Sequence, residues 1–363
     1  MKTALFERHQ QLGARIAPFG GWDMPIQYAG IIAEHEHTRR DASVFDICHM
    51  GEFELRGASA ETDLERLLTM SVASIAVGQC KYGFLLNDQG GVIDDLTCYR
   101  LDDQHFMLVV NAATCTGDAA WIRERLSPGT EFHDISAWTG KLDVQGPRSR
   151  QLLEDALETT LPDLGYFRFA RINLLGVSCL LSRTGYTGEW GYELYVPVET
   201  VTFFWDAIVR RGDIKPAGLG ARDTLRLEVG YPLYGHELTA DRTPAAAFGK
   251  NFMALDKEFT GRASVMADLE NGSTQQLVGL ALDGRRAARA EDRVLDAEGN
   301  PAGFITSGSL APSLGHAIAM AYVDRKAMES SGGLQVEVKG SKLPCRVAPL
   351  PFYQQGTARK KST

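Results

Sequence analysis

The sequence Asn87-Asp-Gln-Gly-Gly-Val-Ile-Asp94-Asp95-Leu-Thr-Cys-Tyr99 combines a tight turn with the start of a strand. Glycines at the turn permit the positive backbone angles that it requires, and the apolar residues that follow favour an extended strand. Adjacent strand residues point to opposite faces, so one aspartate is predicted to face an interior pocket and the other to face water. A carboxylate in a pocket can orient an amine or accept its proton. Two solvated turn acids are the alternative for this stretch alone.

The length and charge of the chain limit its class. Its 363 residues exceed the usual size of one hydrophobic core, so we expect two or three domains. A formal net charge of −8 argues against a nonspecific nucleic-acid surface or an anionic-membrane surface. No apolar run reaches the length of a membrane span, and residues 1–9 contain no apolar signal core. The sequence therefore predicts a cytoplasmic protein that binds neither nucleic acid nor membrane.

The spacing of the cysteines and histidines does not match a metal-binding motif. The six cysteines are scattered without C-x-x-C spacing, which favours reduced thiols over a zinc or redox motif. The densest group of candidate ligands is Glu34-His35-Glu36-His37, with His49 further along the chain. On a helix this spacing spreads the side chains around the axis, so we expect a solvated or locally hydrogen-bonded helix start and no metal.

The order of the predicted elements favours the α+β class. Helices are predicted at 31–40, 63–68, 118–126 and 199–211, and strands at 52–56, 82–86, 105–111 and 177–182. They do not alternate as βαβ units, which argues against a doubly wound sheet. From about residue 275, short strands separated by turn residues predict a small β-barrel or sandwich. The tail, 358–363, is predicted to be disordered.

Gly218-Leu-Gly-Ala-Arg-Asp223 resembles part of a dinucleotide-binding fingerprint. Asp223 stands where the third glycine belongs, and its carboxylate would meet a phosphate, so NAD binding is rejected. Arg222 and Arg226 lie one helical turn apart and suit a carboxylate ligand. The alternative for these two arginines is a surface or interdomain salt bridge.

Tyr186 and Glu193 flank a glycine-rich turn between two predicted strands. A carboxylate at Glu193 could accept hydrogen bonds from an aminopyrimidine-like edge, and Tyr186 could stack against the ring. Hairpins of glycine, tyrosine and threonine are common, so this feature is weak when taken alone.

Taken together, these segments resemble the aminomethyltransferase (T-protein) family of the glycine cleavage system. The blocks follow the family's order over nearly the whole chain, and their joint occurrence is specific. They are Phe19-x-Gly-Trp22, Glu34-His35, Phe45-Asp46-x-x-His49-Met50, Gly90-Gly-Val-Ile-Asp-Asp95, Val110-Asn111, Val144-Gln-Gly-Pro147, Thr184-Gly-Tyr-Thr-Gly-Glu189 with Gly191-Tyr-Glu193, Gly218–Glu228, Leu233-Tyr-Gly235 with Glu237, and Ile305-Thr-Ser-Gly308 with Pro312-x-Leu-Gly315.

The resemblance implies a three-domain cloverleaf around a central folate-binding cavity, with a small C-terminal β-barrel. The expected domains are an α+β folate-binding domain of residues 1–50 and 138–275, an α+β domain of residues 51–137, and a barrel of residues 276–363. The resemblance assigns the catalytic role to Asp94, beside the folate nitrogens that receive the one-carbon unit. The implied folate-binding residues are Met50, Tyr82, Val110, Asn111, Tyr186, Glu193, Arg222 and Tyr231.

The implied reaction needs no metal and no covalent protein nucleophile. An aminomethyl group on the lipoyl arm of an H-protein-like carrier loses ammonia, and tetrahydrofolate captures the carbon as 5,10-methylenetetrahydrofolate. Tetrahydrofolate is thus a substrate, and the protein contributes positioning and negative charge. The alternatives are a tetrahydrofolate-dependent demethylase of a small methylated compound and a non-catalytic folate-binding protein.

Two positions depart from the family pattern. Cys48 replaces the usual serine before His49-Met50, and a small residue is tolerated there. Asn251 stands where several relatives carry an aromatic residue, which leaves the identity of the one-carbon donor open.

Overall fold

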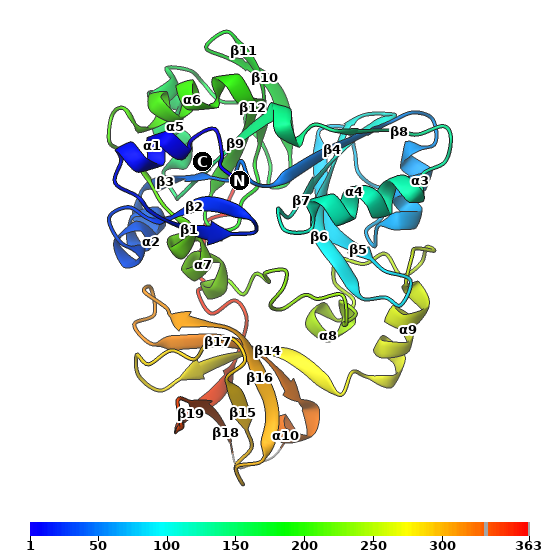
Figure 1. Cartoon of the computed structure of the whole chain (residues 1–363), viewed down its shortest axis with the longest axis vertical. Coiled ribbons are helices and arrows are strands. Elements are labelled where there is room, and N and C mark those ends of the chain that lie inside the picture. The colour runs from blue at the N-terminus through cyan, green and yellow to red at the C-terminus, as the bar shows by residue number, and fades with distance from the viewer. Residues whose placement is uncertain (330–332, 362–363) are drawn as a thin grey trace.

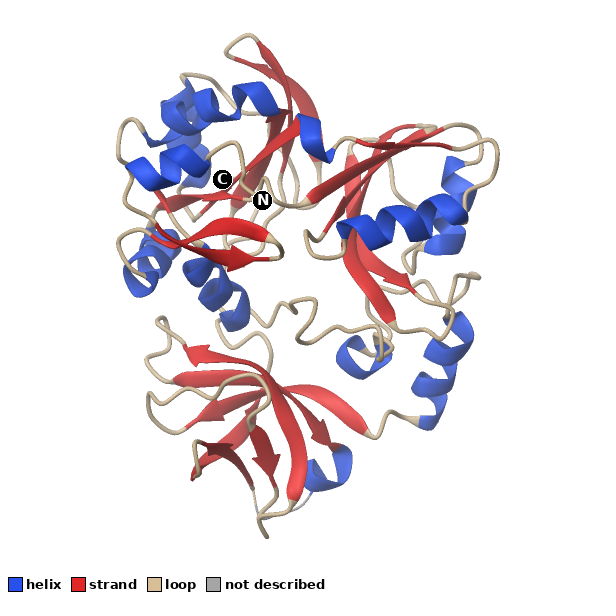
Figure 2. Ribbon diagram, viewed as in Figure 1, coloured by secondary structure: helices blue, strands red, loops and turns tan. Residues whose placement is uncertain are grey.

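The computed structural model describes residues 1–329 and 333–361, which form three lobes around a common centre (Figure 1). Each lobe is built on its own β-sheet, and helices pack against the sheets of the first two lobes (Figure 2). The third sheet closes into a barrel. The predicted α+β class and C-terminal barrel are therefore confirmed. Among the described residues, no helix is both long enough and apolar enough to cross a membrane.

The first lobe combines the N-terminal segment with the middle of the chain. Its helices are α1 (Phe6–Gln11), α2 (Ile31–Arg40), η1 (Ser136–Trp138), α5 (Ser149–Leu157), η2 (Val198–Thr200), α6 (Val201–Val209) and α7 (Leu219–Glu228). Its strands are β1 (Arg15–Phe19), β2 (Trp22–Gln27), β3 (Ala42–Asp46), β9 (Thr139–Gln145), β10 (Phe169–Leu174), β11 (Val177–Ser182), β12 (Gly191–Pro197) and β13 (Ile214–Pro216).

Strands β1 and β2 form a separate hairpin, and the other six form one sheet in the order β10-β11-β12-β9-β3-β13. All neighbours in this sheet are antiparallel except β13 and β3. In β9, Leu142 and Val144 belong to the hydrophobic core of the lobe. Because side chains alternate along a strand, Lys141 and Asp143 point to the opposite face.

The second lobe is inserted between β3 and β9. Its elements are β4 (Gly51–Arg56), α3 (Ala60–Leu67), β5 (Gln79–Leu86), β6 (Val92–Asp102), β7 (His105–Val110), α4 (Cys115–Glu124) and β8 (Glu131–Asp134). The strands form an antiparallel sheet in the order β5-β6-β7-β4-β8. The sheets thus group residues 51–134 apart from the strands on either side, while the domain boundaries themselves stay a prediction.

The third lobe is a closed barrel with strand order β14-β17-β16-β15-β18-β19. Its elements are β14 (Gln275–Leu282), β15 (Arg293–Leu295), β16 (Pro301–Leu310), β17 (Ala317–Asp324), α10 (Arg325–Glu329), β18 (Leu334–Val338) and β19 (Ser341–Ala348). A long connection precedes it and contains α8 (Ala245–Phe248) and α9 (Arg262–Asn271), which lie between the second lobe and the barrel (Figure 1).

The C-terminal segment returns to the first lobe. The Arg183 guanidinium donates to the carbonyls of Ala358 and Lys360 over 2.8 and 3.0 Å, and the Ala358 amide donates to the Gly188 carbonyl over 3.0 Å. The prediction of disorder is therefore wrong for residues 358–361, because buried arginine donors bind their backbone. Residues 362 and 363 lie outside the described part of the chain.

Candidate active site

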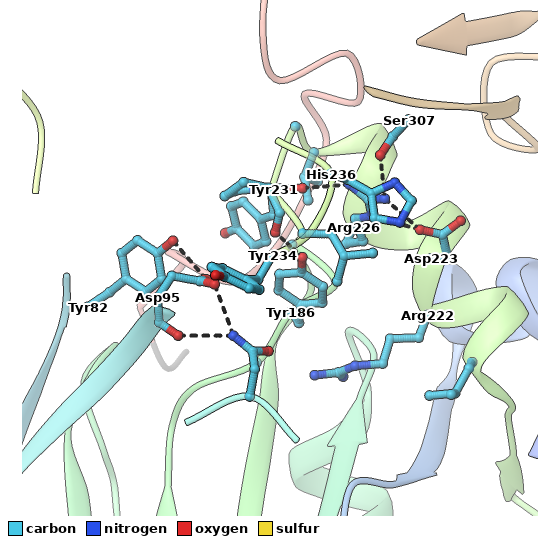
Figure 3. Close-up of a pocket in the computed structure, with 18 of the residues that line it drawn as sticks. Tyr82, Asp95, Tyr186, Arg222, Asp223, Arg226, Tyr231, Tyr234, His236 and Ser307 are labelled. Carbon is cyan, nitrogen blue, oxygen red and sulfur yellow. Dashed lines mark hydrogen bonds and ion pairs between the residues drawn. The ribbon is translucent and has the colours of Figure 1, made fainter. Parts of the chain in front are cut away.

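A cavity of about 1250 Å³ lies where the three lobes meet, and residues from all three line it. Figure 3 shows how side chains from β5, β6 and α7 and from the connection after α7 converge on it. Seven of the nine predicted site residues line this one cavity. They are Met50, Tyr82, Asn111, Tyr186, Glu193, Arg222 and Tyr231.

Asp95 presents its carboxyl to the cavity from strand β6. The Tyr82 hydroxyl donates to its Oδ2 over 3.0 Å, and Asn111 Nδ2 donates to its Oδ1 over 3.0 Å (Figure 3). Burial raises the pKa of Asp95 to about 7, the charge of Asp94 adds to this effect, and the two hydrogen bonds oppose it. Asp95 can therefore exchange a proton near neutral pH.

Asp94, to which the catalytic role was assigned from the sequence, does not line the cavity. Its side chain is fully buried, and its oxygens accept from Asn111 N and Nδ2 over 2.9 and 2.7 Å. The two acids do point to opposite faces of β6, as predicted. The cavity-facing acid is Asp95, however, and Asp94 faces the interior of the second lobe instead of water.

Behind Asp94 lies Asp118, an acid that the sequence analysis missed. It is fully buried in the first turn of α4, within hydrogen-bonding reach of the Asp94 carboxyl. Burial of this carboxyl outweighs its side-chain hydrogen bonds with Asp94 and Thr114, which lower its pKa. Burial raises the pKa of Asp118 to about 7, and burial together with Asp118 raises that of Asp94 well above its usual value. The Asp94–Asp118 pair consequently retains a proton at neutral pH.

Glu193 lies on a second wall of the cavity, in strand β12. Its Oε2 accepts from the Thr184 hydroxyl over 2.6 Å, and the Tyr195 hydroxyl lies 3.3 Å away. Burial alone would raise the pKa of Glu193, but the Lys141 charge and the hydrogen bonds outweigh it and lower the pKa below its usual value. Glu193 is therefore an ionised acceptor at neutral pH.

Two tyrosines and an arginine form a further wall of the cavity that Asp95 and Glu193 line. The rings of Tyr186 and Tyr231 lie 5.8 Å apart at an interplanar angle of 30°. The Arg222 guanidinium of α7 lies 5.0 Å from the centre of the Tyr186 ring and forms an ion pair with Asp143 of β9. A flat ring system could stack on this wall while its edge reaches Glu193.

Val110 is the second predicted residue that does not reach the cavity. It is fully buried in the hydrophobic core of the second lobe, and Val109 lines the cavity instead. Neighbouring residues of β7 point to opposite faces, so the Val110-Asn111 pair of the motif places only Asn111 at the site.

Arg226 forms ion pairs with Asp223 of its own helix and with Glu237 of the connection that follows, and its contact with the barrel is a hydrogen bond. Its guanidinium donates to Glu237 over 3.0 Å. It also donates to Ser307 of the barrel over 2.8 Å (Figure 3). Arg226 is almost completely buried, and its hydrogen bond to Ser307 connects α7 of the first lobe to the barrel.

Glu34 and His35 hold the first lobe together and do not line the cavity. Glu34 accepts from the Gly218 amide over 2.8 Å at the start of α7, and His35 contacts Thr224 over 2.8 Å.

Asn251, the position that departs from the family pattern, does not line the cavity. Phe252 and Phe248 do, and the Phe252 ring packs edge-on against Tyr82 with 5.1 Å between ring centres. Neighbouring positions therefore supply the aromatic wall.

Across the described residues, no three His, Cys, Asp or Glu side chains are grouped so as to hold a metal ion.

Comparison with known proteins identifies the family. Residues 5–257 match the GCVT N-terminal domain, and residues 275–354 match the glycine cleavage T-protein C-terminal barrel domain. The chain belongs to the glycine cleavage T-protein family. Aminomethyltransferases of Saccharopolyspora erythraea and Moorella thermoacetica are 42% and 43% identical to it, and each match covers 98% of both chains.

A solved T-protein structure has the same fold. The chain superposes on the glycine cleavage system aminomethyltransferase T from Bartonella henselae with a TM-score of 0.92 at 32% identity, over 98% of this chain and 99% of that one. This T-protein family member is thus an enzyme of the aminomethyltransferase type.

Proposed function

We propose that this enzyme transfers the one-carbon unit of an aminomethyl-lipoyl carrier, an H-protein, to tetrahydrofolate. The observation that carries the proposal is the shared cavity of Asp95 and Glu193, which presents one acid with a near-neutral pKa and one ionised acid on separate walls. A reduced pterin needs both kinds of group, an acceptor for its amino edge and a base near its reacting nitrogens.

The reaction balances without an added oxidant or metal. The carbon–sulfur and carbon–nitrogen bonds of the aminomethyl group break, and the carbon forms bonds to N5 and N10 of tetrahydrofolate. Those two nitrogens lose one proton each. One proton goes to the departing lipoyl thiolate and the other to the departing amine, which leaves as ammonia. The products are the dihydrolipoyl carrier, ammonia and 5,10-methylenetetrahydrofolate.

Asp95 is proposed to take the role that the sequence motif assigned to its neighbour. Its carboxylate faces the cavity, where it would stabilise the cationic, iminium-like carbon and accept a proton from the attacking nitrogen. The hydrogen bonds from Tyr82 and Asn111 fix the orientation of the carboxylate. A preoriented charge in a site shielded from water is more effective than the same charge in bulk solvent.

The other predicted residues are proposed to bind the folate. Glu193 would accept from the pterin amino edge, and Tyr186 and Tyr231 would stack against its rings. Arg222 would neutralise acidic groups of the ligand. Met50 and Asn111 would complete the pocket around the reacting end.

One assay tests the proposal. Tetrahydrofolate is supplied with an aminomethyl-lipoyl carrier or, in parallel, with small methylated sulfur, nitrogen or oxygen donors, and methylenetetrahydrofolate, 5-methyltetrahydrofolate and ammonia are measured. We expect methylenetetrahydrofolate and ammonia in equal amounts from the carrier alone. Formation of 5-methyltetrahydrofolate from a small methylated donor, without ammonia release, would instead support a demethylase.

A further inference from the structure

Lys141 is a buried cation in the cavity wall to which no role has been assigned. It lies in β9 on the face opposite the core residues Leu142 and Val144, and its side chain is 1% exposed. It nevertheless lines the cavity. A lysine at such a depth is uncommon unless its charge has a partner.

The ammonium of Lys141 has no hydrogen-bonded oxygen among the described residues. Its nearest polar neighbours are Met50 Sδ at 3.7 Å and Glu193 Oε1 at 3.9 Å, and the Tyr195 ring centre lies 4.8 Å away. An ammonium carries three donors, and leaving them unpaired in a buried site is costly. Its partners are thus one weak sulfur acceptor and one carboxylate at ion-pair distance, which leaves hydrogen-bonding capacity for a ligand.

The two carboxylate oxygens of Glu193 differ in their hydrogen bonding. Its Oε2 is surrounded by the hydroxyls of Thr184, Tyr195 and Tyr99 at 2.6 to 3.4 Å. Its Oε1 accepts no hydrogen bond from a described residue and is the oxygen closest to Lys141. Lys141 and Glu193 Oε1 thus form an ion pair at 3.9 Å, too far apart for a direct hydrogen bond, so the cavity wall presents an acceptor and a donor side by side.

We propose that Lys141 and Glu193 together recognise the 2-amino-4-oxo edge of the pterin, with Lys141 donating to the 4-oxo oxygen. This inference rests on the proposed function and adds a specificity determinant to it. The pterin edge presents two N–H donors followed by one carbonyl acceptor. Glu193 accepts from the donors, and the neighbouring ammonium pairs with the carbonyl. A 4-amino pteridine places a donor against the ammonium and lacks the N3–H that Glu193 accepts, so it is rejected.

A purely structural role for Lys141 is the competing explanation. Glu52 is also buried, one of its oxygens has no partner among the described residues, and the Lys141 charge lowers the pKa that burial of Glu52 raises. Lys141 could thus serve only as the counter-ion of Glu52 and Glu193. Such a role predicts that replacing Lys141 weakens all folates alike, whereas recognition of the carbonyl predicts a change in selectivity.

The test compares tetrahydrofolate with an analogue that carries an amino group in place of the 4-oxo oxygen and therefore also lacks the N3–H. Tetrahydrofolate and 4-amino-4-deoxytetrahydrofolate are titrated calorimetrically into the full-length protein with oxygen excluded. We expect the protein to bind the 4-oxo ligand at least about 100-fold more tightly. In Lys141→Met this preference falls at least about tenfold, mainly through weaker binding of the 4-oxo ligand, and the part that comes from the N3–H donated to Glu193 remains. Glu52→Gln, which removes a neighbouring acid that does not line the cavity, retains the full preference.

The outcomes separate this inference from the function on which it rests. If the unmodified protein binds neither ligand, the proposed function fails. If it prefers the 4-oxo ligand and Lys141→Met weakens both ligands equally, the function stands and the role of Lys141 is refuted. Thermal unfolding without ligand shows whether the variant folds. If Lys141→Met does not fold, Lys141→Gln replaces it, and its shorter, uncharged side chain is expected to lower the preference at least about tenfold.

Discussion

The Tyr82 hydroxyl donates a hydrogen bond to Asp95 Oδ2 over 3.0 Å. The register of β5 and β6 explains this contact, because Asp95 lies opposite Phe84 and Tyr82 precedes Phe84 by two residues on the same face of the sheet. The pairing directs the second acid of the Asp94-Asp95 pair into the cavity and leaves the first in the interior of the lobe.

Replacing Asp95 tests which of the two acids acts in the reaction. We expect Asp95→Asn to lower kcat about 100-fold or more and the affinity for tetrahydrofolate less than about tenfold, because the change removes the base and charge at the reacting end. Asp94→Asn does not alter the cavity surface and should reduce kcat far less in the folded fraction. The larger kcat loss in Asp94→Asn would restore the assignment made from the sequence motif.

The pH dependence of kcat/KM reports the ionisation of Asp95. Its pKa is raised to about 7, so an active carboxylate predicts a rate that rises with pH and levels off above about 7. The Tyr82 hydrogen bond favours the ionised form and lowers this pKa. Tyr82→Phe should therefore move the rising limb to higher pH, as measured by initial rates between pH 5 and 9. An unshifted limb would show that another group controls the rate.

Much of the secondary structure around Asp94 and Asp95 can be predicted from the local sequence. Which of these two acids faces the cavity cannot. The turn before Val92, the strand after it and the opposite orientation of Asp94 and Asp95 depend on glycine conformation and on the pleat alone. Which face becomes a cavity wall depends on what packs behind the sheet. Here that is Asp118 in α4, and neither spacing nor periodicity around residue 94 indicates it.

The residues proposed to bind folate were also only partly predictable from the sequence. Tyr186, Glu193 and Arg222 were found because their motifs combine turn residues with a charged or aromatic side chain. Lys141 was missed, since a single lysine in an apolar strand reads as a solvent-facing position until the neighbouring lobe buries it. The chain tail was misjudged for a similar reason, because its backbone is held by donors of Arg183, far away in sequence.

Asp118 is expected to make stability depend on pH. Its pKa is raised by burial to about 7, so between its ordinary value of 3.8 and about 7 the folded state binds the proton more tightly than the unfolded state. Its contribution to stability is therefore present at low pH and is lost as pH rises through that range. Asp118→Asn should lose less stability than the unmodified protein between pH 5 and 8, as followed by urea unfolding. The exposed Asp103→Asn is the control, and equal pH slopes in all three proteins would contradict the prediction.

The buried ion pair of Arg226 and Glu237 is expected to stabilise the fold next to the barrel. The Arg226 guanidinium and the Glu237 carboxylate are both almost fully buried. Arg226→Met leaves the Glu237 charge without its cation, so we expect a loss of about 3–5 kcal/mol in the free energy of unfolding. In Arg226→Met/Glu237→Met both charges are absent, and urea unfolding should show a smaller loss than in the single variant. A larger loss in the double variant would assign the effect to packing.

Phe252 is expected to keep water away from the reacting carbon. It is 46% exposed at the cavity, packs against Tyr82 and has a left-handed backbone with φ of 62°, a conformation that aromatic residues rarely adopt. An iminium-like carbon that meets water is lost as formaldehyde and ammonia instead of reaching tetrahydrofolate. In Phe252→Ala the ratio of formaldehyde to methylenetetrahydrofolate should rise several-fold, because water can then enter beside Tyr82.

The control is Phe203→Ala, which removes a similarly exposed ring from α6, outside the cavity lining, and should leave the product ratio unchanged. Equal ratios in the two variants would mean that the Phe252 ring does not shield the reaction.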